Sequence, residues 1–85
     1  MLRITTDDSV PTRRLIVEGR LKGNNVAELE RSCAAEPGAV SLDLSNLIHV
    51  DEQGLRLLSA LQGAGNELLN ASPFIRMLLE QQRES

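Results

Sequence analysis

The sequence predicts one α/β domain over residues 1–85, with a single mixed, mostly parallel four-stranded sheet and three helices on one face of it. The first observation is an alternation of apolar Val40, Leu42 and Leu44 with Ser41 and Asp43, which is typical of a strand with one covered face. The second is the leucine-rich stripe that follows it, which has helical spacing. The third is the order of predicted elements, β-β-α-β-α-β-α, in which strand–helix–strand units require parallel neighbours.

The first two strands are predicted at residues 2–6 and 15–17, and Gly19 is expected to end the second. A turn at residues 7–11, rich in Asp, Ser and Pro, separates them. Two strands this close in sequence are expected to pair antiparallel.

The first helix is predicted to follow a loop at residues 19–23. Asn25 is a good N-cap, and Glu28 stands three residues later, as in a capping box. Apolar residues then recur on one helical face, and Pro37-Gly38 ends the helix.

The second helix is predicted to begin after Asp51, whose carboxylate can accept the free N–H groups of the first turn. Gly63 and Gly65 are expected to end it, and a fourth strand follows at residues 67–70.

Ser72 and Pro73 open the last predicted helix, as N-cap and first helical residue, and residues 81–85 are predicted to be a polar tail. The apolar residues of this helix span an arc too wide for one sheet face to cover. Either a partner protein covers part of the arc, or a thin core recruits every apolar group.

The composition limits the classes of function. An 85-residue chain buries only about 60–65% of its unfolded surface, and with one Phe, no Trp and no Tyr, aliphatic residues must fill the core. The net charge of −3 gives nucleic acid no reason to bind. The chain has no apolar run long enough to insert into a membrane, and its one Cys indicates a reducing, cytoplasmic location. With one His and one Cys sixteen residues apart, neither a metal nor another cofactor is expected.

The stretch from Leu42 to Leu55 follows the pattern L-D-L-S-x-L-x-x-V-D-x-x-G-L. This pattern resembles the signature of the STAS family, the sulphate-transporter and anti-sigma-factor-antagonist domains. The resemblance covers nearly the whole chain, because the flanking predicted elements also follow the order of that family. It implies a small member of the STAS fold. In the family the turn reads Asp-Ser-Ser/Thr-Gly-Leu, and the serine after the Asp is phosphorylated by a partner kinase.

Here the turn reads Asp51-Glu52-Gln53-Gly54, so that Glu52 occupies the phospho-acceptor position. Glu52 either supplies a permanent negative charge in place of the phosphate or is only a favourable first-turn residue. Gly54 either leaves the turn open to a partner or allows helix and strand to pack closely, and we favour packing.

The loop after the second strand, Arg20-Leu21-Lys22, is basic where the family is typically acidic. We expect Arg20 or Lys22 to lie within ion-pair reach of Asp51 or Glu52, although unrelated solvated charges are an equal alternative. His49 is predicted in the loop before Asp51, where it either biases the conformation of the loop or is simply solvated. Together with Leu21, Gln53 and Gly54, these residues form the predicted partner-binding site.

The resemblance implies a non-catalytic protein–protein interaction module whose partner is a serine-kinase-type anti-sigma factor, with the switch fixed or absent. The alternative is a structural STAS subunit of a membrane transport complex, for anions or lipids. An enzyme is not expected, because the turn has two carboxylates but no nucleophile, well-placed base or metal set. A homodimer through the uncovered sheet face is left open.

Overall fold

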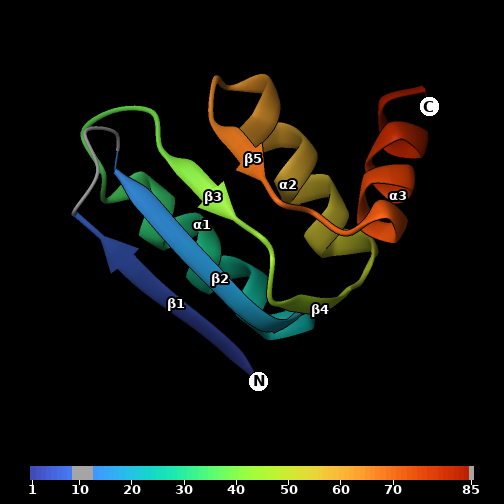
Figure 1. Ribbon diagram of the computed structural model, residues 1–85, viewed down its shortest axis with the longest axis horizontal. Coiled ribbons are helices and arrows are strands. Elements are labelled where there is room, and N and C mark those ends of the chain that lie inside the picture. Colours follow the sequence, from blue (N-terminus) through green and yellow to red (C-terminus); the bar gives the residue numbers. More distant parts are fainter. Residues whose placement is uncertain (9–12, 85) are drawn as a thin grey trace.

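The computed structural model describes residues 1–8 and 13–84. Figure 1 shows the sheet with helices packed behind it. The strands are β1 (Leu2–Asp7), β2 (Arg14–Leu21), β3 (Ser41–Asp43), β4 (Leu47–Val50) and β5 (Glu67–Leu69). The α-helices are α1 (Val26–Ala34), α2 (Glu52–Gly63) and α3 (Pro73–Glu84), and the short 3₁₀ turn η1 (Gly23–Asn25) precedes α1.

The sheet is mixed and has the order β1-β2-β3-β5, with β4 also paired to β2. β1 runs antiparallel to β2, whereas β3 and β4 run parallel to β2 and β5 runs parallel to β3. This confirms the α/β class and the mixed, mostly parallel sheet. The prediction of four strands was wrong, because the segment expected to be a loop before Asp51 forms β4.

The additional strand, β4, forms because β2 is long enough to pair with two strands. β2 does not end at Gly19 but continues to Leu21, so that its first half pairs with β3 and its second half with β4. Between β3 and β4 the chain makes a turn, in which the N–H of Leu47 donates to the carbonyl of Leu44 (3.1 Å). Gly19 has a φ of +94°, and the β2–β4 register shifts directly after it. The predicted turn at residues 7–11 lies largely outside the described residues.

The start of α2 was predicted correctly, and so was the start of α3, where the Oγ of Ser72 accepts from the N–H of Ile75 at 3.2 Å. Asn25 is the N-cap residue of α1, as predicted, but the predicted capping box with Glu28 was wrong, because the side chain of Asn25 makes no capping hydrogen bond. The side chain of Asn25 turns back instead, accepting from the N–H of Lys22 (2.7 Å) and donating to the carbonyl of Arg20 (2.8 Å). The prediction that the last helix ends before a polar tail at residue 81 was also wrong, because residues 81–84 continue α3.

The core is aliphatic, as the composition predicted. It lies between the sheet and the helices, and Figure 1 shows α1 and α2 behind the strands with α3 beside α2. α3 packs mainly against α2 rather than against the strands. The buried apolar residues are Leu15, Val17, Leu21, Leu29, Val40, Leu42, Leu44, Leu47, Val50, Leu55, Leu58, Ile75 and Leu79.

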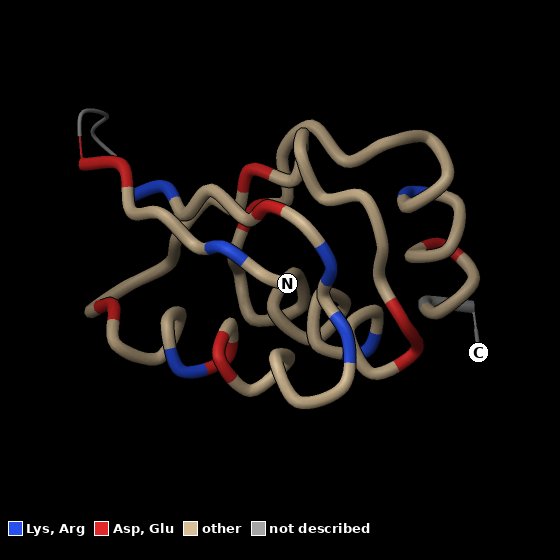
Figure 2. The backbone as a smooth tube through the Cα atoms, turned by 90° about the horizontal axis from the view of Figure 1, so that it is seen from below, with Lys and Arg blue, Asp and Glu red and all other residues tan. Residues whose placement is uncertain are grey.

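The apolar arc of α3 is not fully covered. Ile75 and Leu79 are buried, but Phe74 is 64% exposed and Met77 is 46% exposed. A core that recruits every apolar group therefore does not explain this helix. The charged residues are interspersed along the chain, without a large segment of one sign (Figure 2).

Candidate functional site

Asp51 joins the first turn of α2 to the segment that follows β2. One carboxylate oxygen accepts from the N–H of Gly54 (2.8 Å), and the other accepts from the N–H of Gly23 (2.9 Å). Its own N–H donates to the carbonyl of Leu21 (3.1 Å). The two backbone donors, together with the charge of His49, hold the pKa of Asp51 below its usual value. Asp51 therefore has a structural role as the N-cap and as a link between two distant segments.

Glu52 and Gln53 are exposed on the first turn of α2. Glu52 forms an ion pair with Arg56, one turn along the helix, and both side chains are mostly solvated (69% and 64% exposed). Such an exposed helical pair stabilises by only about 0.3–0.5 kcal/mol. The Glu52 carboxylate is therefore accessible to another molecule at little energetic cost.

Gly54 is buried and faces β2 and β4. A Cβ at this position would lie 2.7 Å from Cγ2 of Val50 and 2.8 Å from the carbonyl oxygen of Leu21. The glycine allows α2 to approach the sheet closely, which supports the packing role favoured from the sequence. Its location offers no open surface to a partner.

The predicted ion pair between the basic loop and the acidic turn is not present. Neither Arg20 nor Lys22 forms an ion pair with Asp51 or Glu52 among the described residues. The physical reason is that both oxygens of Asp51 accept backbone N–H groups, whereas Glu52 pairs within its own helix.

Three of the predicted site residues lie together on the surface. Arg20 and His49 are register partners on β2 and β4, and with Lys22 they line a shallow hollow. Leu21, the other member of the predicted loop, is fully buried in the core, so its side chain cannot contact a partner.

Ile48 also lines this hollow and was missed by the sequence analysis. It is 72% exposed, while its neighbour Leu47 is buried. The sequence contains no signal for this residue, because Ile48 stands between apolar Leu47 and polar His49 and the strand alternation stops at Asn46. Only the pairing of β4 with β2 and the burial of Leu47 show that Ile48 faces outward. We call the exposed residues around the start of α2 the α2-tip surface: Arg20, Lys22, Ile48, His49, Glu52 and Gln53.

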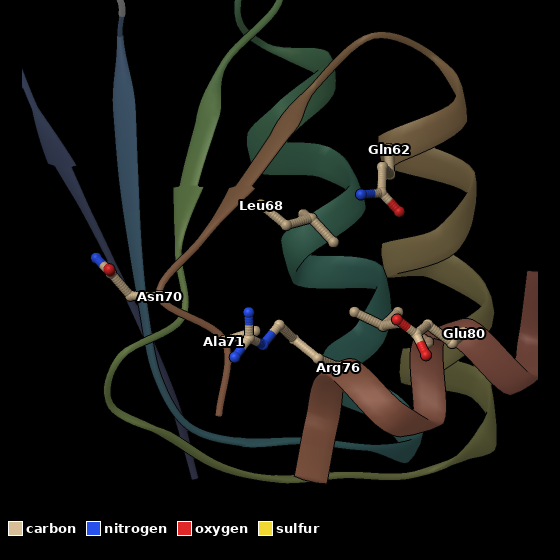
Figure 3. Close-up of a pocket in the computed structure, with 7 residues that line it drawn as sticks. Gln62, Leu68, Asn70, Ala71, Arg76 and Glu80 are labelled. Atoms are coloured by element: carbon tan, nitrogen blue, oxygen red, sulfur yellow. The ribbon is translucent and has the colours of Figure 1, made fainter. Parts of the chain in front are cut away.

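A second and larger hollow, of about 490 Å³, opens between the C-terminal half of α2, β5 and α3 (Figure 3). Figure 3 shows Arg76 reaching from α3 toward Ala71, while Asn70 points away from the hollow. The lining contains neither Cys, His nor Ser. No group of His, Cys, Asp and Glu side chains among the described residues is arranged to hold a metal ion.

No model of a known protein family matches the chain. The comparison with curated proteins found no match either. The resemblance to STAS domains therefore stays a prediction from the sequence. None of the helices within residues 1–8 and 13–84 combines the length and apolarity needed to cross a membrane.

Proposed function

We propose that the chain is a non-catalytic protein–protein interaction module similar to anti-sigma-factor antagonists, and that its partner binds the α2-tip surface. The observation that carries the proposal is the double hydrogen bonding of Asp51, which fixes the turn between β4 and α2 against the start of η1. The side chains of Glu52 and Lys22 are exposed on either side of this fixed backbone. A backbone that is already fixed loses little conformational entropy when a partner binds, so that only the exposed side chains have to be ordered.

Glu52 determines how such a module is regulated. A phosphoserine at this position carries a charge of about −1.5 to −2, whereas a glutamate carries about −1 and cannot be dephosphorylated. The binding state of the module is then constant, because residue 52 cannot be phosphorylated or dephosphorylated. The partner in this proposal is a serine-kinase-type anti-sigma factor in the cytoplasm, and neither nucleic acid nor a membrane is bound directly.

The test is quantitative affinity capture from the native host with the wild type, Glu52→Ala and Glu52→Ser, followed by affinity measurements on the purified partner. Glu30→Ala is the matched control, because Glu30 is an exposed acidic residue on α1 and lines a hollow near the C-terminal end of α2. We expect Glu52→Ala to weaken binding by about tenfold, as for an interface contact worth more than 1 kcal/mol, and Glu30→Ala to leave it unchanged. Equal recovery of the same partner by all four proteins would show that Glu52 does not control binding.

A structural subunit of an anion or lipid transport complex is the second candidate. It is favoured by the exposed Phe74 and Met77, which lie one turn apart on α3, because permanent interfaces are more apolar than transient ones. The double variant Phe74→Ser/Met77→Ser distinguishes the two candidates. Loss of partner capture in this variant, with normal capture by Glu52→Ala, supports the structural subunit.

The proposal assigns no catalytic residue. The α2-tip surface contains the Glu52 carboxylate, His49 and Lys22, but no Ser, Thr or Cys side chain. Any catalytic turnover by the purified protein that is lost in Glu52→Gln would contradict this part of the proposal.

A further inference from the structure

β1 forms one open edge of the sheet. It pairs only with β2, and Figure 1 shows no segment of the described chain along its other side. An edge strand has unpaired backbone N–H and carbonyl groups that can bond a further strand. At six residues, β1 is twice as long as β5, the strand at the other end of the order, which has three.

The hydrogen bonds to β2 show which backbone groups of β1 face outward. The N–H of Arg20 donates to the carbonyl of Met1 (3.0 Å), and the N–H of Gly19 donates away from β1, to Asn46 (3.0 Å). In an antiparallel pair the bonded residues alternate. The backbone groups of Leu2, Ile4 and Thr6 therefore point toward the open edge, whereas Arg3, Thr5 and Asp7 are bonded to β2.

The charges on β1 are placed symmetrically about Thr5. Arg3 and Asp7 lie two residues before and two residues after it, on the face of the sheet that also carries their register partners on β2. Arg3 is opposite Glu18, and Asp7 is opposite Arg14. Each charge on β1 therefore already faces an opposite charge on β2.

We propose that a second copy of the chain binds this edge, with the two β1 strands antiparallel and centred on Thr5. In this register Ile4 exchanges backbone hydrogen bonds with Thr6 of the second copy, so that the outward-facing groups are used. Arg3 then lies opposite Asp7 of the second copy, in the non-bonded type of pair whose Cα atoms are only about 4.5 Å apart. The two-fold symmetry repeats the contact, and the two sheets join into one.

Charge complementarity selects a second copy as the occupant. Across the junction the face has a row of alternating charges: Glu18, Arg3, then Asp7 and Arg14 of the second copy. Charged residues on an edge strand normally discourage pairing with other strands. The charges of Arg3 and Asp7 disfavour pairing with strands that lack matching charges. In an antiparallel copy of β1 centred on Thr5, however, each of these residues meets the opposite charge. This surface is separate from the α2-tip surface, and the inference does not depend on the proposed function.

The first test is sedimentation equilibrium over a range of protein concentrations, with the wild type, Arg3→Asp and Asp7→Arg. We expect the wild type to dimerise, with weaker dimerisation in high salt. Each variant places like charges opposite each other twice in its own homodimer, and we expect dimerisation to weaken by about tenfold or more. An equimolar mixture of the two variants has complementary charges at both positions and should dimerise like the wild type.

The equimolar mixture distinguishes charge repulsion between the two β1 strands from damage to the folded monomer. Arg3→Asp also places an acid opposite Glu18 in its own chain, and mixing cannot correct that contact. Thermal unfolding followed by circular dichroism will show whether each variant is folded. A wild type that stays monomeric at all concentrations, single variants that dimerise normally, or folded variants that fail to recover on mixing would each overturn the proposal.

The second test removes a backbone donor. The N–H of Thr6 faces the open edge, so Thr6→Pro removes a bond to the second copy without removing one to β2. We expect Thr6→Pro to be folded and monomeric and Thr6→Ala, which keeps the N–H, to dimerise. A folded Thr6→Pro that still dimerises like Thr6→Ala would contradict pairing through this edge.

Discussion

At the scale of single residues, Asp51 connects the sequence motif to the tertiary structure. Capping of α2 follows from its position before a leucine-rich helix, but the second hydrogen bond, from the N–H of Gly23, joins segments 28 residues apart. The same carboxylate thus stabilises the helix and the loop after β2. This double use explains why an aspartate is suited to the position whether or not a partner binds there.

The pH dependence of stability tests the role of the Asp51 charge. Asp51→Asn keeps one acceptor oxygen for the N-cap, removes the charge, and replaces the second acceptor oxygen with an NH₂ group that cannot accept a backbone N–H. Because the folded-state pKa of Asp51 is lowered, its ionised form stabilises the fold above the ordinary value of 3.8, and this stabilisation is lost as the pH falls through the lower folded-state pKa. We expect the wild type to be more stable than Asp51→Asn near neutral pH, and the difference to vanish in strong acid.

Urea unfolding of both proteins over a range of pH measures this difference. The pKa of Asp43 is also lowered, chiefly by a hydrogen bond from the backbone of Ser45. That contribution is common to both proteins and cancels in the comparison. A stability difference that does not change with pH would mean that the charge of Asp51 contributes nothing.

Gly54 provides a second prediction at this scale. Gly54→Ala places a Cβ within 2.8 Å of both a Val50 methyl group and a backbone carbonyl oxygen, and the carbonyl cannot easily move. We expect the free energy of unfolding to fall by about 1–3 kcal/mol, as for overpacked cores. Urea denaturation measures it.

The matched control is Gly63→Ala, at the last residue of the same helix, where a Cβ meets nothing within 4 Å. Since alanine has a higher helix propensity than glycine, this variant should be neutral or more stable by up to about 1 kcal/mol. If both alanine variants changed stability equally, close packing at Gly54 would not be the reason for the glycine.

At the scale of elements, α3 has one packed and one exposed apolar side. Leu79→Ala and Ile75→Ala should each cost about 2–5 kcal/mol, because both side chains are buried. Met77→Ala and Phe74→Ala should change stability by less than about 0.5 kcal/mol, as for surface positions. Chemical denaturation of the four variants checks the difference, and a large loss from Phe74→Ala would show that this ring is covered in the monomer.

β4 shows why an element of this kind escapes prediction. Its four residues have the burial pattern buried, exposed, exposed, buried, which lacks the strand period of two and matches the i, i+3 spacing of a helix instead. It is a strand because the second half of β2 presents free backbone groups there, after a shift of register at Gly19. Sequence patterns describe a residue's own neighbours and contain little information about such a partner.

At the scale of the whole molecule, a single core includes side chains from all three α-helices and from β2, β3 and β4. We therefore expect one cooperative unfolding transition, with α3 unfolding together with the sheet. The chain has no Trp or Tyr for fluorescence, so amide NMR signals followed in increasing urea are the appropriate measurement. If the amide signals of α3 had a lower urea midpoint than those of β2, α3, which packs mainly against α2, would be a separate unfolding unit.

The sequence by itself determined the elements that local chemistry specifies. Alternation identified the central strand, the caps at Asp51 and Ser72 located the starts of α2 and α3, and the absence of aromatic residues other than Phe74 predicted an aliphatic core. Only the tertiary structure decided the fifth strand, the burial of Leu21, the replacement of the expected ion pair by hydrogen bonds to Asp51, and the continuation of α3 to Glu84. The physical reason for the first three is that each depends on which distant backbone or side chain lies opposite, and a pairing between segments far apart leaves no periodic signal in either segment.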